Sequence, residues 1–378
     1  MIPYGHQQID PLDIEAVVNV LKTDWLTQGP KVEEFESALA TYCGVKYAVV
    51  VSNGTAALHA AYVAAGLNTG DEFITSPLTF VATANAGLWQ GAKPVFVDVD
   101  ERDGNINPSL IEEKITKKTK LIAPIDYTGR PVDFEAIRRI ADKHNLLIVE
   151  DACQALGAIY RGKKIGSLSD LTVFSFHPVK TIATGEGGAI LTDREDLYKK
   201  MKVFVTHGIT KKDFVYPSHG EWYFEMQMLG MNYRLTDLQC ALGISQLSRI
   251  DTFLARRRSI VAKYNEAFKG PDAISVPPPE RDGEESAWHL YVMRLADRLV
   301  LKRAHIFKKL REAGIGVQVH HMPAYLHPYY QSLGFSRGLC PVAEAFYDSI
   351  ISLPLYPGLE DSEQDYVISK VKEVLTSV

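Results

Sequence analysis

Short apolar runs alternate with segments of helix length between residues 47 and 192. The runs are rich in β-branched residues and cover residues 47–52, 72–76, 94–98, 121–125, 146–151, 171–176 and 188–192. Strands that alternate with helix-length connections form a mostly parallel sheet covered by helices on both faces. The pattern therefore predicts a doubly wound α/β unit with a sheet of seven strands.

Helical spacing of apolar residues predicts an opening helix over residues 11–22, where Asp10 can cap the first turn and Pro11 suits it. A second helix is predicted over residues 56–65, which are rich in strong helix formers, with Gly66 as the C-cap. Because this helix directly follows a strand, its N-terminus should face the carboxyl edge of the sheet.

The last third of the chain has a different pattern. One long helix is predicted over about residues 247–269, and its basic run at 256–258 is interpreted as a solvated helix face rather than a polyanion site. A turn-rich break at 277–283 precedes what looks like a smaller α+β unit. The predicted division is an N-terminal arm and helix over 1–30, a large domain over 31–246, and a linker helix with a small domain over 247–378.

Composition excludes several classes of protein. The 378 residues carry a net charge of −5, so neither sign dominates, which argues against nucleic-acid or membrane binding by bulk electrostatics. No apolar run approaches the ~20 residues that span a bilayer, and no secretory signal opens the chain. The four cysteines are scattered, with no C-x-x-C spacing, which suits a reducing cytoplasm.

Residues whose side chains could bind a ligand or take part in a reaction follow the ends of four predicted strands. The segments are 52–55 (SNGT), 76–80 (SPLTF), 150–154 (EDACQ) and 175–180 (SFHPVK). In open α/β sheets, ligands bind beyond the carboxyl ends of the strands. Each residue alone has an ordinary structural explanation, such as a helix cap, a turn or a surface lysine. Their shared position is what indicates a site.

The four segments together suit pyridoxal phosphate. A glycine-led helix N-terminus with a hydroxyl suits a phosphate, because free N–H groups and the helix dipole both favour an anion. An aromatic ring can stack on a flat heterocycle, a carboxylate can hold a ring nitrogen protonated, and a lysine can form an imine. Pyridoxal phosphate requires all four features.

Across nearly the whole chain the sequence resembles the DegT-type nucleotide-sugar aminotransferases. The resemblance is carried, in family order, by segments 26–30 (LTQGP), 52–55, 79–83 (TFVAT), 150–152, 174–177 (FSFH), 185–188 (GEGG) and 230–234 (GMNYR). It implies the fold of pyridoxal-phosphate-dependent transferases of fold type I, similar to aspartate aminotransferase. In that fold a large domain with a mostly parallel seven-stranded sheet carries a small C-terminal α+β domain.

The resemblance also implies residue roles. Lys180 matches the Schiff-base lysine, which also transfers protons, and Asp151 matches the partner of the pyridine nitrogen. The other implied cofactor contacts are Gln154 at the phenolic oxygen, Phe80 on the ring face, and Gly54, Thr55 and Ser175 at the phosphate. Asn232 matches an asparagine that reaches the phosphate from the second subunit, so a homodimer with shared active sites is expected.

Lys180 separates two chemistries, because related sugar dehydratases resemble these enzymes but carry histidine at this position. Lysine favours transamination, with L-glutamate as the expected donor and a keto-sugar nucleotide as the acceptor. A non-catalytic regulatory protein that binds pyridoxal phosphate is a further alternative. The presence of Lys180, Asp151 and Gln154 together argues against it.

The C-terminal segment 314–330 resembles the family's V-H-Y-x-P motif and looks closest to the members that act in pseudaminic acid synthesis. These aminate C4 of a UDP-linked 4-keto-6-deoxy-N-acetylhexosamine. Alternatives are UDP-bacillosamine-type or perosamine-type amination at C4, or dTDP-sugar amination at C3. His321 departs from the family's usual tyrosine. The expected substrate contacts are Thr27, Gly29, Tyr127, His177, Arg234, His320, His321 and His327.

Other candidate motifs do not support metal, dinucleotide or ATP binding. Residues 98–104 resemble a calcium loop, but the acidic residues are misregistered and no glutamate closes the loop. No G-x-G-x-x-G opens a helix after the first strand, and no P-loop occurs. We expect no metal site.

Overall fold

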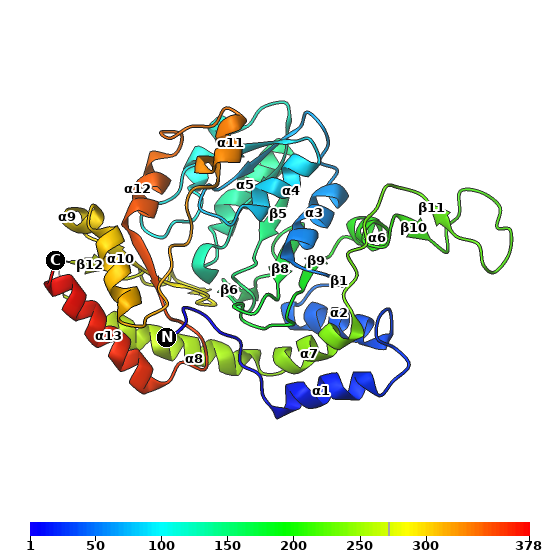
Figure 1. Ribbon diagram of the computed structural model, residues 1–378. Coiled ribbons are helices and arrows are strands. Elements are labelled where there is room, and N and C mark those ends of the chain that lie inside the picture. Colours follow the sequence, from blue (N-terminus) through cyan, green and yellow to red (C-terminus); the bar gives the residue numbers. More distant parts are fainter. Residues whose placement is uncertain (271–272) are drawn as a thin grey trace.

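A seven-stranded sheet forms the centre of the protein. The computed structural model describes residues 1–270 and 273–378 (Figure 1). Neighbouring strands are parallel except where β9 pairs with β1 and β8. The strand order is β1 (Tyr47–Val51), β9 (Gly188–Thr192), β8 (Leu171–Ser175), β5 (Leu147–Asp151), β4 (Thr119–Ala123), β2 (Glu72–Thr75) and β3 (Lys93–Phe96). The predicted mostly parallel sheet is confirmed.

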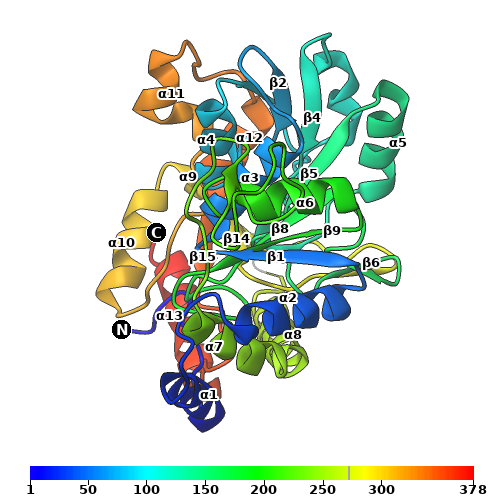
Figure 2. The same ribbon diagram turned by 90° about the vertical axis from the view of Figure 1, so that its right-hand side faces the viewer.

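Helices cover both faces of this sheet (Figure 2). Successive strand residues point to opposite faces, and in β1 the side chains of Val49 and Val51 join one hydrophobic cluster while Ala48 and Val50 join another. The first cluster includes side chains from α3 (Gly54–Ala64), α4 (Ala82–Trp89) and α6 (Glu195–Phe204). The second includes side chains from α2 (Pro30–Cys43), α5 (Phe134–His144) and α7 (Asp237–Leu247).

The two predicted N-terminal helices form, with small shifts at their ends. Helix α1 (Pro11–Leu21) starts as expected, because the Asp10 side chain accepts hydrogen bonds from the backbone N–H groups of Leu12 and Asp13. Helix α3 starts at Gly54, two residues before the predicted start, because the Asn53 side chain accepts a hydrogen bond from the Ala56 N–H at 2.8 Å.

The long C-terminal helix is shorter than predicted, and its basic run is not simply a solvated face. Helix α8 spans Ile250–Ala267, after a break that follows α7. Arg257 is fully buried, and its Nη1 donates to the carbonyl oxygens of Trp288, His289 and Leu355. The expectation of a solvated face was wrong for this residue, because this side of α8 packs against the C-terminal part of the chain.

The C-terminal part has its own small sheet and hydrophobic cluster. Its antiparallel sheet is ordered β12 (Ile274–Ser275), β14 (Tyr291–Leu295) and β15 (Ile350–Leu353). The associated helices are α9 (Asp297–Val300), α10 (Arg303–Glu312), α11 (Pro328–Ser332), α12 (Pro341–Ser349) and α13 (Asp361–Thr376). A short three-stranded sheet, β13 (Glu284–Glu285), β6 (Ile159–Tyr160) and β7 (Lys163–Lys164), joins two distant parts of the sequence.

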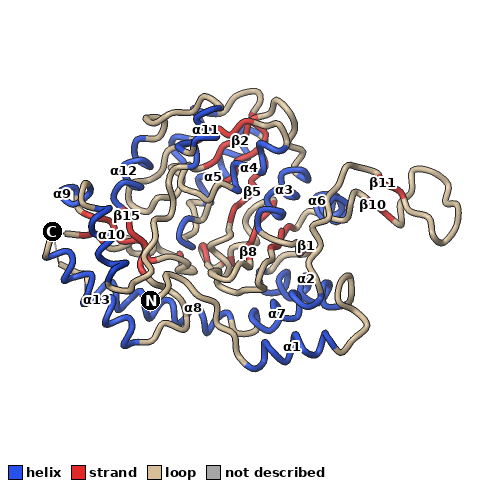
Figure 3. Tube along the Cα trace, viewed as in Figure 1, coloured by secondary structure: helices blue, strands red, loops and turns tan. Residues whose placement is uncertain are grey.

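A narrow arm with β10 (Ile209–Thr210) and β11 (Glu225–Met226) projects from the body (Figures 1 and 3). It exposes large apolar side chains, namely Val215, Tyr216, Trp222, Phe224, Met226 and Leu229. No helix in the described part of the chain is both long and apolar enough to cross a membrane.

Candidate active site

A pocket of about 800 Å³ lies at the carboxyl edge of the sheet, where it meets the segment 318–321. Strand β1 leads into Gly54 and Thr55, β2 leads toward Phe80, β5 ends at Asp151, and β8 ends at Ser175. Because these strands point the same way, their ends meet at one edge. The predicted residues that line the pocket are Gly54, Thr55, Phe80, Asp151, Gln154, Ser175, His177, Lys180, His320 and His321.

The start of α3 offers free donors to an anion. The backbone N–H groups of Gly54 and Thr55 have no hydrogen-bond acceptor among residues 1–270 and 273–378. Gly54 is needed here because a Cβ at this position would lie 2.9 Å from Ser175 Cβ and 3.2 Å from Cys153 Sγ. The absence of a side chain therefore lets the start of α3 approach the end of β8 and leaves the Ser175 hydroxyl beside the helix N-terminus.

Asp151 is a buried carboxylate held in one orientation. Its Oδ2 accepts a hydrogen bond from Thr83 Oγ1 at 2.5 Å, and its Oδ1 accepts from the Cys153 N–H at 3.2 Å. Only 6% of the residue is exposed. A carboxylate fixed in this way at the floor of a pocket is suited to hold a positive charge or a proton on a bound ring.

Lys180 brings an amine into the same pocket. Its backbone N–H closes a turn by donating to the His177 carbonyl oxygen at 2.8 Å, while its Nζ has no hydrogen-bond or ion-pair partner in the described part of the chain. Burial lowers the pKa of the amine below its ordinary value, although the nearby Asp151 charge opposes this shift. The neutral amine, which is the nucleophilic form, is therefore more accessible than in a surface lysine.

The histidines at the opposite wall are held neutral. Burial, together with the charge of Lys180, lowers the pKa of His320 to about 4. Burial also holds the pKa of His321 well below its ordinary value. His320 Nδ1 is 2.9 Å from Ser352 Oγ, and this hydrogen bond fixes the orientation of the His320 ring. These two histidines therefore offer neutral hydrogen-bonding groups to the pocket that Lys180 also lines.

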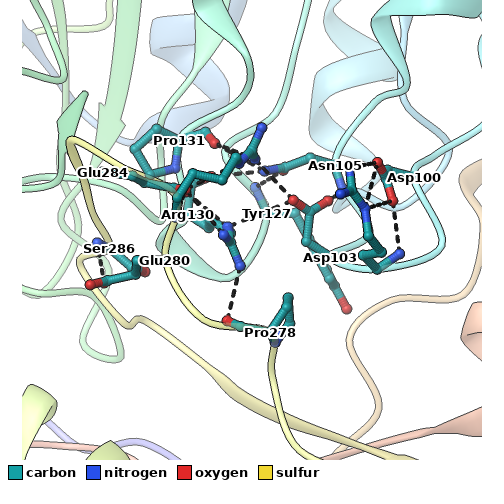
Figure 4. A network of polar contacts seen from close by, with 12 residues as sticks. Asp100, Asp103, Asn105, Tyr127, Arg130, Pro131, Pro278, Glu280, Glu284 and Ser286 are labelled. Atoms are coloured by element: carbon teal, nitrogen blue, oxygen red, sulfur yellow. Dashed lines mark hydrogen bonds and ion pairs between the residues drawn. The ribbon is translucent and has the colours of Figure 1, made fainter. Parts of the chain in front are cut away.

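Tyr127 lies behind this wall and does not line the pocket. The side chain is buried, and its hydroxyl donates to the His320 carbonyl oxygen. Its backbone N–H donates to Asn105 Oδ1 at 2.9 Å, which joins it to the polar network around Arg130 (Figure 4). In this chain Tyr127 is placed to position His320.

The remaining predicted contacts also lie outside this pocket. Asn232 and Thr27 are exposed, and each forms an isolated backbone bridge. Gly29 and Arg234 line a separate hollow of about 210 Å³. His327 lines a shallow surface pocket with Trp89. These residues therefore do not share one cavity with Lys180 within a single chain.

Sequence reasoning missed several residues of the pocket wall. Cys153 could have been found, since it lies between Asp151 and Gln154, and Tyr233 directly follows Asn232. Glu186 lies within the quoted segment 185–188 but was given no role. His289 follows the turn-rich break, and no local motif marks it. Only the long-range packing of its loop brings it to the pocket.

The donor set fits pyridoxal phosphate. Unpaired N–H groups at Gly54 and Thr55 suit the phosphate, the fixed Asp151 carboxylate suits a ring nitrogen, and the unpaired Lys180 amine suits the aldehyde. In the described residues, no group of three or more His, Cys, Asp or Glu side chains is arranged to hold a metal ion.

Comparisons with known proteins agree with this chemistry. Residues 7–372 match the DegT/DnrJ/EryC1/StrS aminotransferase family. The chain is 40% identical over 378 residues to the spore coat polysaccharide biosynthesis protein SpsC of Bacillus subtilis, covering 99% of this chain and 97% of that protein. It is also 40% identical over 381 residues to UDP-4-amino-4,6-dideoxy-N-acetyl-beta-L-altrosamine transaminase of Campylobacter jejuni, covering 100% and 98%.

Solved structures are similar over the whole chain. Helicobacter pylori PseC, an aminotransferase involved in the biosynthesis of pseudoaminic acid, gives a TM-score of 0.94 at 35% identity and covers 100% of both chains. The PLP-form of a putative sugar aminotransferase from Streptococcus pneumoniae gives a TM-score of 0.94 at 32% identity and covers 100% of this chain and 99% of that one. The chain therefore belongs to the DegT/DnrJ/EryC1/StrS family and is a nucleotide-sugar aminotransferase of fold type I that depends on pyridoxal phosphate.

Proposed function

We propose that the enzyme moves the amino group of L-glutamate to C4 of a UDP-linked 4-keto-6-deoxy-N-acetylhexosamine, as in pseudaminic acid synthesis. The observation that carries the proposal is the pocket that Lys180 and Asp151 line together with the neutral imidazoles of His320 and His321. The similarity to the altrosamine transaminase supports the choice of sugar.

Pyridoxal phosphate, when bound, supplies an electron sink for negative charge at the donor's α-carbon. Lys180 Nζ would move the proton from that carbon to C4′ of the cofactor and, in the second half-reaction, a proton from C4′ to C4 of the acceptor. A depressed pKa leaves more of the amine neutral near pH 7 and so favours its action as a base. Asp151 holds a proton at the ring nitrogen, and its orientation is kept by Thr83 and Cys153.

The remaining pocket residues bind and orient. Gly54, Thr55 and Ser175 bind the phosphate, Gln154 lies at the phenolic oxygen, and Phe80 lies against the ring. His177, His320 and His321 bind the sugar nucleotide. The neutral imidazoles of His320 and His321 suit this task, because each can donate one hydrogen bond and accept another without a fixed charge.

We further propose a cytoplasmic homodimer in which each copy completes the other's site. Asn232, Thr27, Gly29 and Arg234 lie outside their own chain's pocket, which leaves them free to serve a second copy. The apolar arm supports this arrangement, because exposed groups such as Trp222 and Leu229 commonly mark an interface. The four unpaired cysteines suit a reducing compartment.

A substrate panel tests the reaction. The protein is incubated with L-glutamate and a set of UDP- and dTDP-linked 4-keto and 3-keto sugars, and NMR identifies each amino sugar formed. We expect amination at C4 of the UDP-linked 4-keto-6-deoxy-N-acetylhexosamine, giving the altro-configured product. Accumulation of its gluco isomer, or of a 3-amino sugar, would contradict the assigned substrate while leaving the reaction class intact.

Mixing two inactive variants tests the shared site. In a hybrid dimer of Lys180→Ala and Asn232→Ala, one pocket holds both native residues. Random exchange should restore about a quarter of wild-type activity, since half of the dimers are hybrids with one working site of two. Mixing that restores nothing, with exchange of subunits shown by mass spectrometry, would reject the contribution of Asn232 across the interface.

A further inference from the structure

His289 is a buried histidine in the pocket wall to which the proposed reaction gives no role. It lies in the loop between β13 and β14 and is only 6% exposed, yet it lines the same pocket as Lys180 and Gln154. Neither ring nitrogen has a hydrogen-bond partner among the described residues, and Nδ1 is completely buried. Because no ligand atom has room beside Nδ1, Nε2 is the ring nitrogen that can serve a ligand in the pocket.

The backbone around His289 is tightly fixed. Its N–H donates to the Thr128 carbonyl oxygen at 2.8 Å, and its own carbonyl oxygen accepts from Arg257 Nη1 at 3.4 Å. The Thr128 N–H in turn donates to Gln154 Oε1 at 2.7 Å. The Gln154 side chain and the His289 backbone are therefore both held by Thr128.

Gly129 makes this arrangement possible. It has φ of +93°, and a Cβ there would lie 2.6 Å from the Gln154 carbonyl oxygen and 3.0 Å from the His289 nitrogen. Three chain segments thus cross without any side chain between them. Farther out, Arg130 pairs with Glu284 at 2.8 Å and donates to the Pro278 and Pro279 carbonyl oxygens, which fixes the start of the loop (Figure 4).

The charges near His289 favour the neutral ring. Burial holds its pKa well below the ordinary value, and the positive charges of Lys180 and Arg257 act in the same direction. A neutral imidazole has one N–H donor and one lone pair. No described residue accepts from its ring N–H or donates to its lone pair.

We propose that His289 binds the cofactor, donating a hydrogen bond from its ring to an anionic oxygen of pyridoxal phosphate on the side where Gln154 lies. This inference rests on the proposed function, which places the phenolic oxygen at Gln154. A donor fixed by Thr128 and Arg257 stabilises negative charge on that oxygen without having to be ordered when the ligand binds.

The test measures cofactor affinity of the full-length apoenzyme by quenching of tryptophan fluorescence, with no substrate present. His289→Leu should raise the Kd for pyridoxal phosphate roughly tenfold to a hundredfold, as expected for loss of a hydrogen bond to a charged group. His289→Asn or His289→Gln should recover much of the affinity, because each retains an amide donor. His305→Leu, at an exposed histidine on α10, is the control and should leave the Kd unchanged.

Thermal unfolding of the apoenzyme separates binding from a purely structural role. Leucine removes an unpaired buried nitrogen, so the His289→Leu apoenzyme should be at least as stable as wild type, while its gain on adding cofactor should shrink. An unchanged Kd, or an increase only in KM for glutamate, would overturn the inference. If leucine and both amides weaken binding equally, or in proportion to lost apoenzyme stability, the donor role is also rejected. Failure of wild type to bind the cofactor would instead refute the proposed function.

Discussion

The pocket and the network around Arg130 are both rich in polar groups, but they differ in how those groups are paired. Arg130 Nε and Nη2 contact Glu284 at 2.8 and 3.1 Å, and its Nη1 and Nη2 also reach the Pro278 and Pro279 carbonyl oxygens. Lys180 Nζ and the His289 ring have no hydrogen-bond partner in the described residues. Paired groups fix the loops, and unpaired groups remain available to a ligand.

This contrast predicts that substitutions in the pocket reduce activity and spare folding, whereas substitutions in the network reduce stability first.

The largest effect should come from Lys180→Ala. The variant loses both the imine-forming amine and the base, so transamination should fall by at least about 10⁴-fold. The absorbance band of the imine between the cofactor and residue 180 should be lost while the far-UV circular dichroism is unchanged. A variant that kept this absorbance would contradict the role of Lys180.

Asp151→Asn should have the next largest effect. The amide keeps the shape and can still accept from Thr83, but it cannot hold a positive ring nitrogen by charge, so kcat should fall about a thousandfold. Stopped-flow measurement of the glutamate half-reaction gives the rate directly. Asp98→Asn, outside the pocket, is the control. A loss of less than tenfold would show that the ring nitrogen does not depend on this carboxylate.

Arg130→Gln should act on stability. It leaves the buried Glu284 carboxylate without its closest cation, and breaking a buried pair costs about 3 kcal/mol or more. Urea unfolding measures the loss. Arg102→Gln is the matched control, because that side chain is 73% exposed and its pair with Asp100 should contribute less than about 1 kcal/mol. Equal losses in the two variants would remove the distinction between buried and exposed pairs.

The smallest expected effect is a pH dependence of apoenzyme stability that arises from the pocket wall. His320 has a folded pKa of about 4, so the unfolded chain binds its proton first as the pH falls below 6.5. Stability should therefore decline toward pH 4, with His320 contributing about 2 kcal/mol of the loss by pH 5. His320→Gln should reduce this loss, and His305→Gln should not. Parallel urea titrations at pH 7 and pH 5 for the three proteins make the comparison.

Much of the fold could be predicted because its signals are local. Each strand of the large sheet is a short apolar run, and Asp10 marks the start of α1. The strand ends placed Asp151, Ser175 and Lys180 near one another, since parallel strands share a carboxyl edge. These predictions required only the local sequence pattern and the direction of the strands in the sheet.

Other features depend on contacts between distant segments. Arg257 looked like part of a solvated basic run, but its partners are backbone carbonyl groups about thirty and a hundred residues away. His289 carries no motif, and its place follows from Thr128, Gly129 and Glu284. The Tyr127 hydroxyl bonds to the backbone carbonyl oxygen of His320, which lies 193 residues away in the sequence. No periodicity in the sequence encodes such pairings.

The crossing at Gly129 has a practical consequence for redesign. The separation between Gln154 and His289 is set there by the thickness of the polypeptide backbone itself, with a hypothetical Cβ only 2.6 Å from the Gln154 carbonyl oxygen. A mutant library that seeks a new acceptor substrate can vary side chains such as His320 and His321 without changing the separation between Gln154 and His289. Residue 129 must stay glycine, because a side chain there would push apart the segments that carry Gln154 and His289.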